Sequence, residues 1–151
     1  NGNSFPEMQE IAKYIKDHSD VNDHIAILGS EPEIFFYSQR RSASPYIYMY
    51  PLMEPQPYAP AMQREMIKNI ESDKPRFFIF VTNNLSWLQY PGSEMLIFRW
   101  FGEYVQNYRQ IGLVEALPDK TLYHWETEPV VTPESSRIYI FERKDYAGRT
   151  Q

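Results

Sequence analysis

The sequence predicts an α/β domain: a mostly parallel sheet flanked by helices, with an antiparallel hairpin at the C-terminal edge. Segments whose apolar residues recur at helical spacing alternate with short, continuous apolar runs. Such runs are typical of strands that are covered on both faces. A chain of 151 residues has the usual length of one domain. We therefore expect residues 1–151 to form a single α/β domain.

The N-terminal segment predicts a helix followed by a strand. Ser4 and Glu7 have the spacing of a capping box, and the apolar residues between Met8 and Ile15 share one helical face. We expect this helix over residues 4–18. The apolar run His24–Gly29 ends at a glycine and predicts the first strand.

The stretch GSEPEIFFYSQRR, which begins at Gly29, predicts a tight turn into a short helix. Ser30 and Glu33 repeat the capping-box spacing, and Pro32 suits the first helical turn. We expect the helix over residues 33–39.

The middle of the chain predicts a strand, a helix and a further strand. Residues 46–50, YIYMY, are β-prone and predict the second strand. The Pro-rich segment 51–60 is expected to be a connection. Apolar residues at intervals of four predict a helix over 61–74, and the apolar run within 75–84 predicts the third strand.

The C-terminal part predicts one helix and three strands. Residues 93–108 predict a helix that is apolar nearly all round at EMLIFRWF. Such a helix is either buried between layers or presents a face to a partner or a membrane surface. Strands are expected over 111–117, 121–125 and 137–144, with the last two forming an antiparallel edge. This order of elements is that of a Rossmann-like three-layer fold.

Composition excludes several classes of site. The net charge of −5 provides no basic footprint, so no nucleic-acid partner is expected. The chain has no cysteine, which excludes disulfides, thiol nucleophiles and cysteine-based zinc sites. Its three histidines stand far apart, without the spacing of metal ligands. No run approaches the ~18 apolar residues of a membrane span.

The candidate site lies where the predicted strands end. Ligands of open parallel sheets bind at the carboxyl ends of the strands, near the point where the strand order reverses. Carboxylate and amide groups there can hydrogen-bond sugar hydroxyls, and arginine binds phosphate oxygens. The alternative to ligand binding is that the arginines are solvated and the aromatic rings close the core. The candidate binding residues are Glu31, Arg40, Arg41, Tyr50, Glu54, Asn83, Asn84 and Trp87.

The sequence lacks the common catalytic motifs. GSEPEI after the first strand has one glycine, so the dinucleotide fingerprint G-x-G-x-x-G fails. There is no Walker loop and no G-x-S-x-G motif. Glu31 and Glu33 can be read as a carboxylate pair, but Glu33 is better explained as a helix-capping partner. No catalytic residue, cofactor or metal is therefore assigned.

One segment carries a family resemblance. HIAILGSEPEIFFYSQRRSASPYIYMYPL is similar to a segment of bacterial multi-spanning membrane glycosyltransferases of the dolichyl-phosphate-mannose protein mannosyltransferase-like (family 39-like) class. In that class a strand leads through G-x-E-P into an aromatic-rich helix, then through SGRR-like residues into a YIYxYPL-like segment. The clear match covers about a fifth of the chain, and the remainder fits more loosely. The matching residues are Gly29, Glu31, Pro32, Tyr37, Ser38, Arg40, Arg41, Tyr46, Tyr48, Tyr50, Pro51 and Leu52.

The resemblance implies a non-catalytic, soluble C-terminal domain on the extracytoplasmic (periplasmic) face of the bacterial inner membrane. The chain starts NGNSF, without an initiator Met, so we expect a fragment of a larger membrane protein. In that class the sugar donor is a polyprenyl-phosphate sugar, and the catalytic carboxylate and metal site lie in the membrane portion. The implied partners are the transmembrane portion of the same polypeptide and a lipid-phosphate sugar or glycan acceptor.

Two other functions stay open at the level of sequence. A free-standing α/β enzyme acting on a small sugar or nucleotide requires a deep pocket lined by Glu31, Asn83 and Asn84. A protein-interaction module requires a wide, flat apolar surface, with EMLIFRWF and the tyrosine-rich edge as its contact residues.

Overall fold

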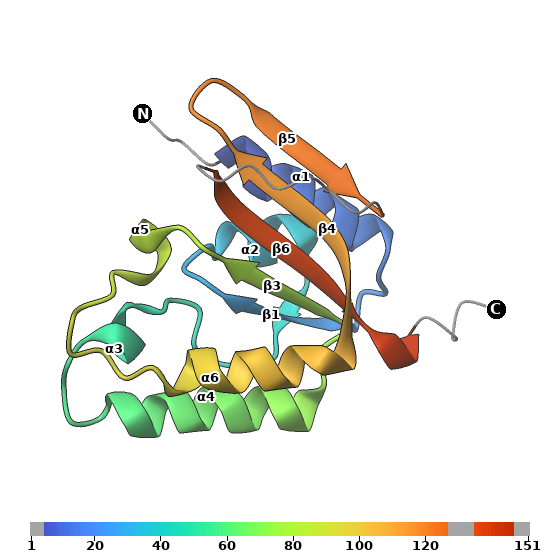
Figure 1. Cartoon of the computed structure of the whole chain (residues 1–151). Coiled ribbons are helices and arrows are strands. Elements are labelled where there is room, and N and C mark those ends of the chain that lie inside the picture. Colours follow the sequence, from blue (N-terminus) through green and yellow to red (C-terminus); the bar gives the residue numbers. More distant parts are fainter. Residues whose placement is uncertain (1–4, 127–134, 147–151) are drawn as a thin grey trace.

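The computed structural model describes residues 5–126 and 135–146, which form a central sheet between two layers of helices (Figure 1). The helices are α1 (Phe5–Asp17), α2 (Glu33–Ser38), α3 (Tyr50–Met53), α4 (Ala59–Asp73), α5 (Asn84–Trp87) and α6 (Leu96–Tyr104), with the 3₁₀ turns η1 (Val105–Asn107) and η2 (Lys144–Tyr146). The strands are β1 (His24–Leu28), β2 (Arg41–Ser42), β3 (Phe77–Val81), β4 (Tyr108–Ala116), β5 (Thr121–Trp125) and β6 (Ser136–Arg143). The α/β class predicted from the sequence is confirmed.

The sheet is mixed, and the prediction of a mostly parallel sheet is wrong. Its order is β2-β1-β3-β6-β4-β5. β1 pairs in parallel with β2 and β3, whereas the pairs β3–β6, β6–β4 and β4–β5 are antiparallel. Because two antiparallel steps restore the direction, β4 runs the same way as β1 and β3. β6 comes last in the chain but lies between β3 and β4, so the edge hairpin is β4–β5 and not the last two strands.

Each face of the sheet buries its own apolar cluster. α1 and α2 cover one face with residues that include Ile11, Ile15 and Ile34. α3, α4 and α6 cover the other face with residues that include Leu52, Met66, Ile70 and Ile97. β1 and β3 supply side chains to both clusters, which is why both strands are continuous apolar runs.

The predicted caps of the first two helices have different outcomes. Ser4 lies outside the described residues, so the capping box at α1 stays a prediction. Ser30 does not cap α2, which has no side-chain cap bond at its start. Instead, the Ser30 Oγ accepts a hydrogen bond from the Met49 N–H at 2.8 Å, which ties the β1–α2 turn to the start of α3.

The predicted strand over residues 46–50 is wrong. Residues 46–49 form a connection, and Tyr50 begins α3, where Pro51 suits the first turn. The position beside β1 is taken by β2, in which Arg41 pairs with His24 directly after α2. The β-prone residues therefore have no strand to pair with. Met49 is buried in the core and Tyr46 packs against it, whereas Ile47 and Tyr48 are exposed.

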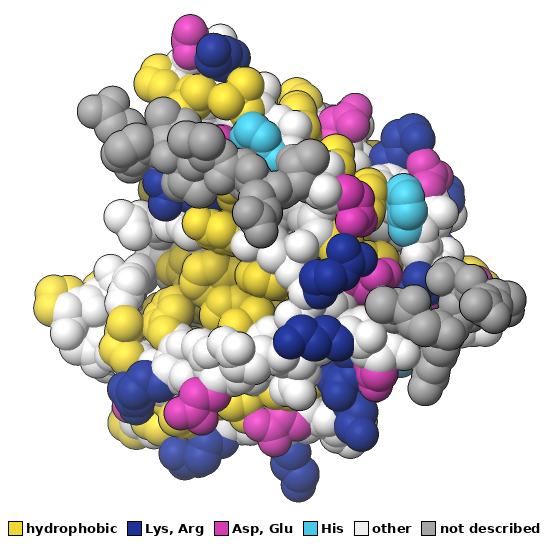
Figure 2. Space-filling view, turned by 45° about the vertical axis from the view of Figure 1, so that its right-hand side comes forward, with side chains coloured by type: hydrophobic (Ala, Val, Ile, Leu, Met, Phe, Trp, Pro, Cys, Tyr) yellow, Lys and Arg dark blue, Asp and Glu magenta, His cyan; other side chains and the backbone are white. Residues whose placement is uncertain are grey.

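The apolar helix α6 is neither fully buried nor free. Ile97 is fully buried, whereas Phe98 and Phe101 are half-buried. The Phe101 ring stacks on Phe80 of β3 at 4.6 Å and meets Phe141 of β6 at 5.9 Å. Figure 2 shows hydrophobic side chains gathered in the middle of one side of the molecule. Among the described residues, no helix has both the length and the hydropathy to cross a membrane.

Candidate functional site

The structure brings part of the predicted site together where β1 and β3 end. After β1 the chain adds β2 on one side of it and then crosses over to add β3 on the other side. The strand order therefore reverses between β1 and β3. Glu31 follows β1, and Asn83 follows β3. In Figure 1 this carboxyl edge is the left side of the molecule, with α3, α5 and the start of α1.

Glu31 is held by a short chain of hydrogen bonds between two loops. The Ser86 hydroxyl donates to Glu31 Oε2 at 2.9 Å. The same Ser86 oxygen accepts from the Ser30 N–H at 2.7 Å. Burial raises the pKa of Glu31 to about 7, the Ser86 hydrogen bond lowers it, and the neighbouring Glu33 raises it further. Glu31 is therefore the one candidate whose carboxyl is poised to exchange a proton near neutral pH.

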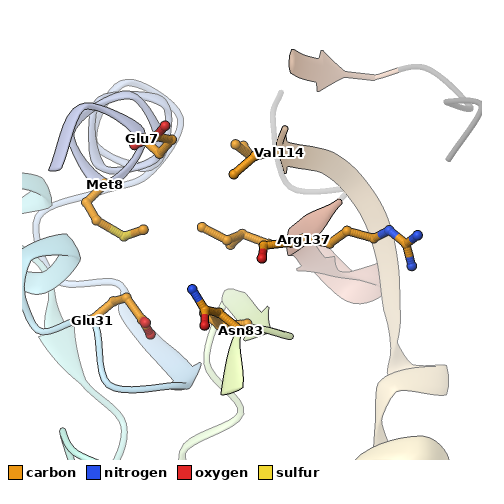
Figure 3. Close-up of a pocket in the computed structure, with 10 residues that line it drawn as sticks. Glu7, Met8, Glu31, Asn83, Val114 and Arg137 are labelled. Atoms are coloured by element: carbon orange, nitrogen blue, oxygen red, sulfur yellow. The ribbon is translucent and has the colours of Figure 1, made fainter. Parts of the chain in front are cut away.

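A small cavity adjoins Glu31 at this edge (Figure 3). Glu31 and Asn83 face it from the two loops, and Met8 and Glu7 border it from α1. Arg137 contributes to its wall, but the guanidinium points away from the cavity. Its volume is about 50 Å³. That volume suits one or two water molecules, at about 30 Å³ each, whereas ligand pockets usually measure roughly 300–1,000 Å³.

The other predicted residues around α5 have structural roles or face solvent. The Asn83 side chain accepts from the Leu85 N–H at 2.9 Å and caps α5. Trp87 is buried and donates its indole N–H to the Val81 carbonyl at 2.7 Å. The Tyr50 hydroxyl donates to the Leu85 carbonyl at 3.3 Å. Asn84 and Glu54 are exposed and do not line the small cavity.

The two predicted arginines separate. Arg40 is 7% exposed, and its guanidinium is surrounded by oxygens of the chain itself. Arg41 lies next to it on β2 and is exposed. The structure thus gives Arg40 a role in holding the fold, and Arg41 stays accessible, away from Glu31.

Sequence reasoning missed the serines that organise this edge. Ser86 was not a candidate, and Ser30 was expected to cap a helix. The Ser86 hydroxyl reaches Glu31, and the Ser30 N–H reaches Ser86, only because the chain folds α5 against the β1 turn. No local sequence pattern marks this contact. It is visible only in the fold, where a Cβ on Gly29 would lie 2.8 Å from Ser86 Oγ and 2.7 Å from Val81 Cγ2.

Within residues 5–126 and 135–146, no group of three or more His, Asp or Glu side chains is placed to hold a metal ion. A comparison of the chain with protein-family models, curated proteins and solved structures finds no match.

Replacing Glu31 by glutamine is expected to change how stability depends on pH. The folded-state pKa of Glu31 is about 7 and its ordinary value is 4.5, so the folded state binds the proton more tightly. Stability from this group is full below pH 4.5 and is lost as the pH rises toward 7. Glu31→Gln mimics the protonated acid, so between pH 4.5 and pH 8 its stability should rise by about 3 kcal/mol relative to the wild type.

Urea unfolding of both proteins across this pH range measures the effect. Glu54→Gln, which removes an exposed carboxylate at the same edge, is the control. Parallel curves for Glu31→Gln and the wild type would show that Glu31 titrates normally.

Proposed function

We propose that this chain is a soluble extracytoplasmic domain of a membrane glycosyltransferase that uses a polyprenyl-phosphate sugar, and that it assists substrate handling or assembly beside the membrane portion. The resemblance of residues 24–52 to the mannosyltransferase-like class is the starting point. In this proposal the transfer chemistry takes place in the membrane portion.

The observation that carries the proposal is how the matching residues divide in the fold. One group is buried and holds the framework: Gly29, Ser38, Arg40 and Leu52. A second group, with Tyr48 and Tyr50, reaches the surface at the carboxyl edge. A segment that builds the fold and also exposes tyrosines at one edge is expected of a domain that binds a partner at that edge.

The geometry supports this function better than a free-standing sugar enzyme. Glu31 and Asn83 do line one cavity, as that alternative requires, but Asn84 does not. The cavity of about 50 Å³ is also several times smaller than a sugar site needs. The poised Glu31 is therefore explained as part of the loop framework and not as an acid acting on a bound sugar.

The test compares transfer of mannose from polyprenyl-phosphate mannose by two purified proteins. One is the 151-residue chain, and the other is the complete encoded protein, including whatever precedes Asn1. We expect turnover by the complete protein alone and several hydrophobic spans in its upstream sequence. Turnover by the 151-residue chain, or a start codon immediately ahead of residue 1, would overturn the proposal.

A further inference from the structure

Two loops at the carboxyl edge form one continuous surface. The Tyr50 hydroxyl donates to the Leu85 carbonyl at 3.3 Å, and the Ser93 hydroxyl donates to the Met53 carbonyl. The Tyr48 and Tyr50 rings stack at 6.0 Å. Residues 42–53 and 82–93, far apart in the sequence, are thus fastened to each other. We call this surface the tyrosine–leucine edge, and its most exposed apolar side chains are Ile47, Tyr48, Leu85, Leu88 and Tyr90.

The tyrosine–leucine edge carries no charge. None of residues 42–53 and none of residues 82–93 is Asp, Glu, Lys, Arg or His, in a chain of which 23% is Asp, Glu, Lys or Arg. The charged residues that directly flank the two loops in the sequence are Arg41, Glu54 and Glu94. A solvent-facing loop surface usually has interspersed charges, so this edge is adapted to a different environment.

The apolar side chains of this edge are held at the surface by buried neighbouring residues. Leu85 is 72% exposed, although Ser86 and Trp87 beside it are buried and hydrogen-bonded. Leu88 sits in the left-handed region, with φ of +49°, and ends α5. Leu85, Leu88 and Tyr90 line an open groove of about 460 Å³. The buried anchors hold the loop in place, so these side chains cannot fold inward.

We infer that the tyrosine–leucine edge rests in the interfacial region of a lipid bilayer. Tyrosine has an apolar ring and a polar hydroxyl and is enriched at this depth, and leucine reaches the acyl boundary. An uncharged surface loses no ionic hydration when it enters the neutral headgroup layer. The flanking Glu54 and Glu94 and the net charge of −5 favour zwitterionic over anionic lipid.

This inference rests on the proposed function, which places the domain beside a membrane. α1 begins at the same edge as α5, whereas η2 lies at the opposite edge (Figure 1). A membrane portion ahead of residue 1 would therefore approach the molecule from the side of the tyrosine–leucine edge.

The test uses single cysteines carrying an environment-sensitive fluorophore, since the chain has no cysteine of its own. Leu85→Cys places the label on the tyrosine–leucine edge. Val21→Cys is the matched control, because Val21 is also 72% exposed but precedes β1 at the opposite edge. A C-terminal hexahistidine tag tethers each protein to phosphatidylcholine vesicles that contain nickel-chelating lipid, so the tether does not draw the labelled edge toward the bilayer.

We expect the label at residue 85 to shift to the blue and to be quenched by nitroxide lipids, while the label at residue 21 stays unchanged. Adding phosphatidylglycerol should weaken the response at residue 85. Tyr48→Ser with Leu88→Asn should weaken it further. Tyr48 is 46% exposed and Leu88 44% exposed, and neither belongs to the buried core, so both positions tolerate the change.

Equal responses at both positions, or no response at residue 85, would overturn the inference. A blue shift at residue 85 without lipid that grows with protein concentration would also overturn it, by assigning the edge to a second copy of the chain. A response at residue 85 in a protein whose coding sequence holds no membrane span would support the inference while overturning the proposed function.

Discussion

Arg40→Ala is expected to destabilise the domain by about 3 kcal/mol. The Arg40 guanidinium donates to Ser19 Oγ at 2.8 Å and to four main-chain carbonyls, those of Lys16, Ser19, Ser38 and Gln39, at 2.9–3.2 Å. All five N–H groups of the side chain are therefore used.

The physical reason for this effect is that Arg40 donates hydrogen bonds to the C-terminal ends of two helices. The Lys16 and Ser19 carbonyls belong to the C-terminal end of α1, and the Ser38 and Gln39 carbonyls to that of α2. Carbonyls at a helix end lack partners within the helix and carry partial negative charge. Without Arg40, one buried and three partly buried carbonyl oxygens lose their donors, and the two helices lose their link.

Urea unfolding followed by circular dichroism measures this prediction. Arg41→Ala is the matched control, because Arg41 is adjacent in sequence but exposed, and its loss should cost less than about 0.5 kcal/mol. Arg40→Lys should fall between the two, since lysine keeps the charge but has three donors. Equal stability of the Arg40→Ala and Arg41→Ala variants would contradict the role given to Arg40.

Gly29→Ala is expected to destabilise the domain by about 2–3 kcal/mol and to displace Glu31. An added Cβ would lie 2.7 Å from Val81 Cγ2 and 2.8 Å from Ser86 Oγ, and closer still to Glu31 Oε2. The Glu31 carboxyl can move aside, but only by leaving the Ser86 hydroxyl. Val81 and Ser86 are buried, so they cannot give way at low cost. The φ of +158° at Gly29 adds a conformation that side chains rarely adopt.

The control for this prediction is Gly102→Ala. Gly102 lies in α6, and nothing comes within 4 Å of an added Cβ. Because alanine favours a helix more than glycine does, this variant should gain up to about 1 kcal/mol. Unfolding midpoints of the two variants should therefore move in opposite directions. A Gly29→Ala protein as stable as the wild type would show that the β1 turn relaxes freely.

Gly29 and Arg40 both belong to the segment that resembles the membrane glycosyltransferases, and both have structural roles. Gly29 allows the β1 turn to approach β3 and α5, and Arg40 links two helix ends. Much of the resemblance is therefore explained by the demands of the fold. The exposed Tyr48 is not explained in this way, which is why it supports the proposed function and the inference about lipid.

Local patterns in the sequence determined the elements that are stable through their own burial. α1 and α4 follow from apolar residues at helical spacing, and β1 and β3 follow from apolar runs that both faces of the sheet cover. The carboxyl edge as the meeting place of Glu31 and Asn83 followed as well, because the ends of parallel strands share one edge.

Only the tertiary structure decided where β6 pairs, why residues 46–50 are not a strand, and that Arg40 is structural. Each of these depends on partners distant in the chain: β6 pairs with both β3 and β4, β2 occupies the place beside β1, and Arg40 reaches carbonyls at the end of α1. A strand or an arginine has the same local sequence pattern whether its partner is water or the chain itself. The choice is made by the free energy of long-range pairing and burial, which no local pattern records.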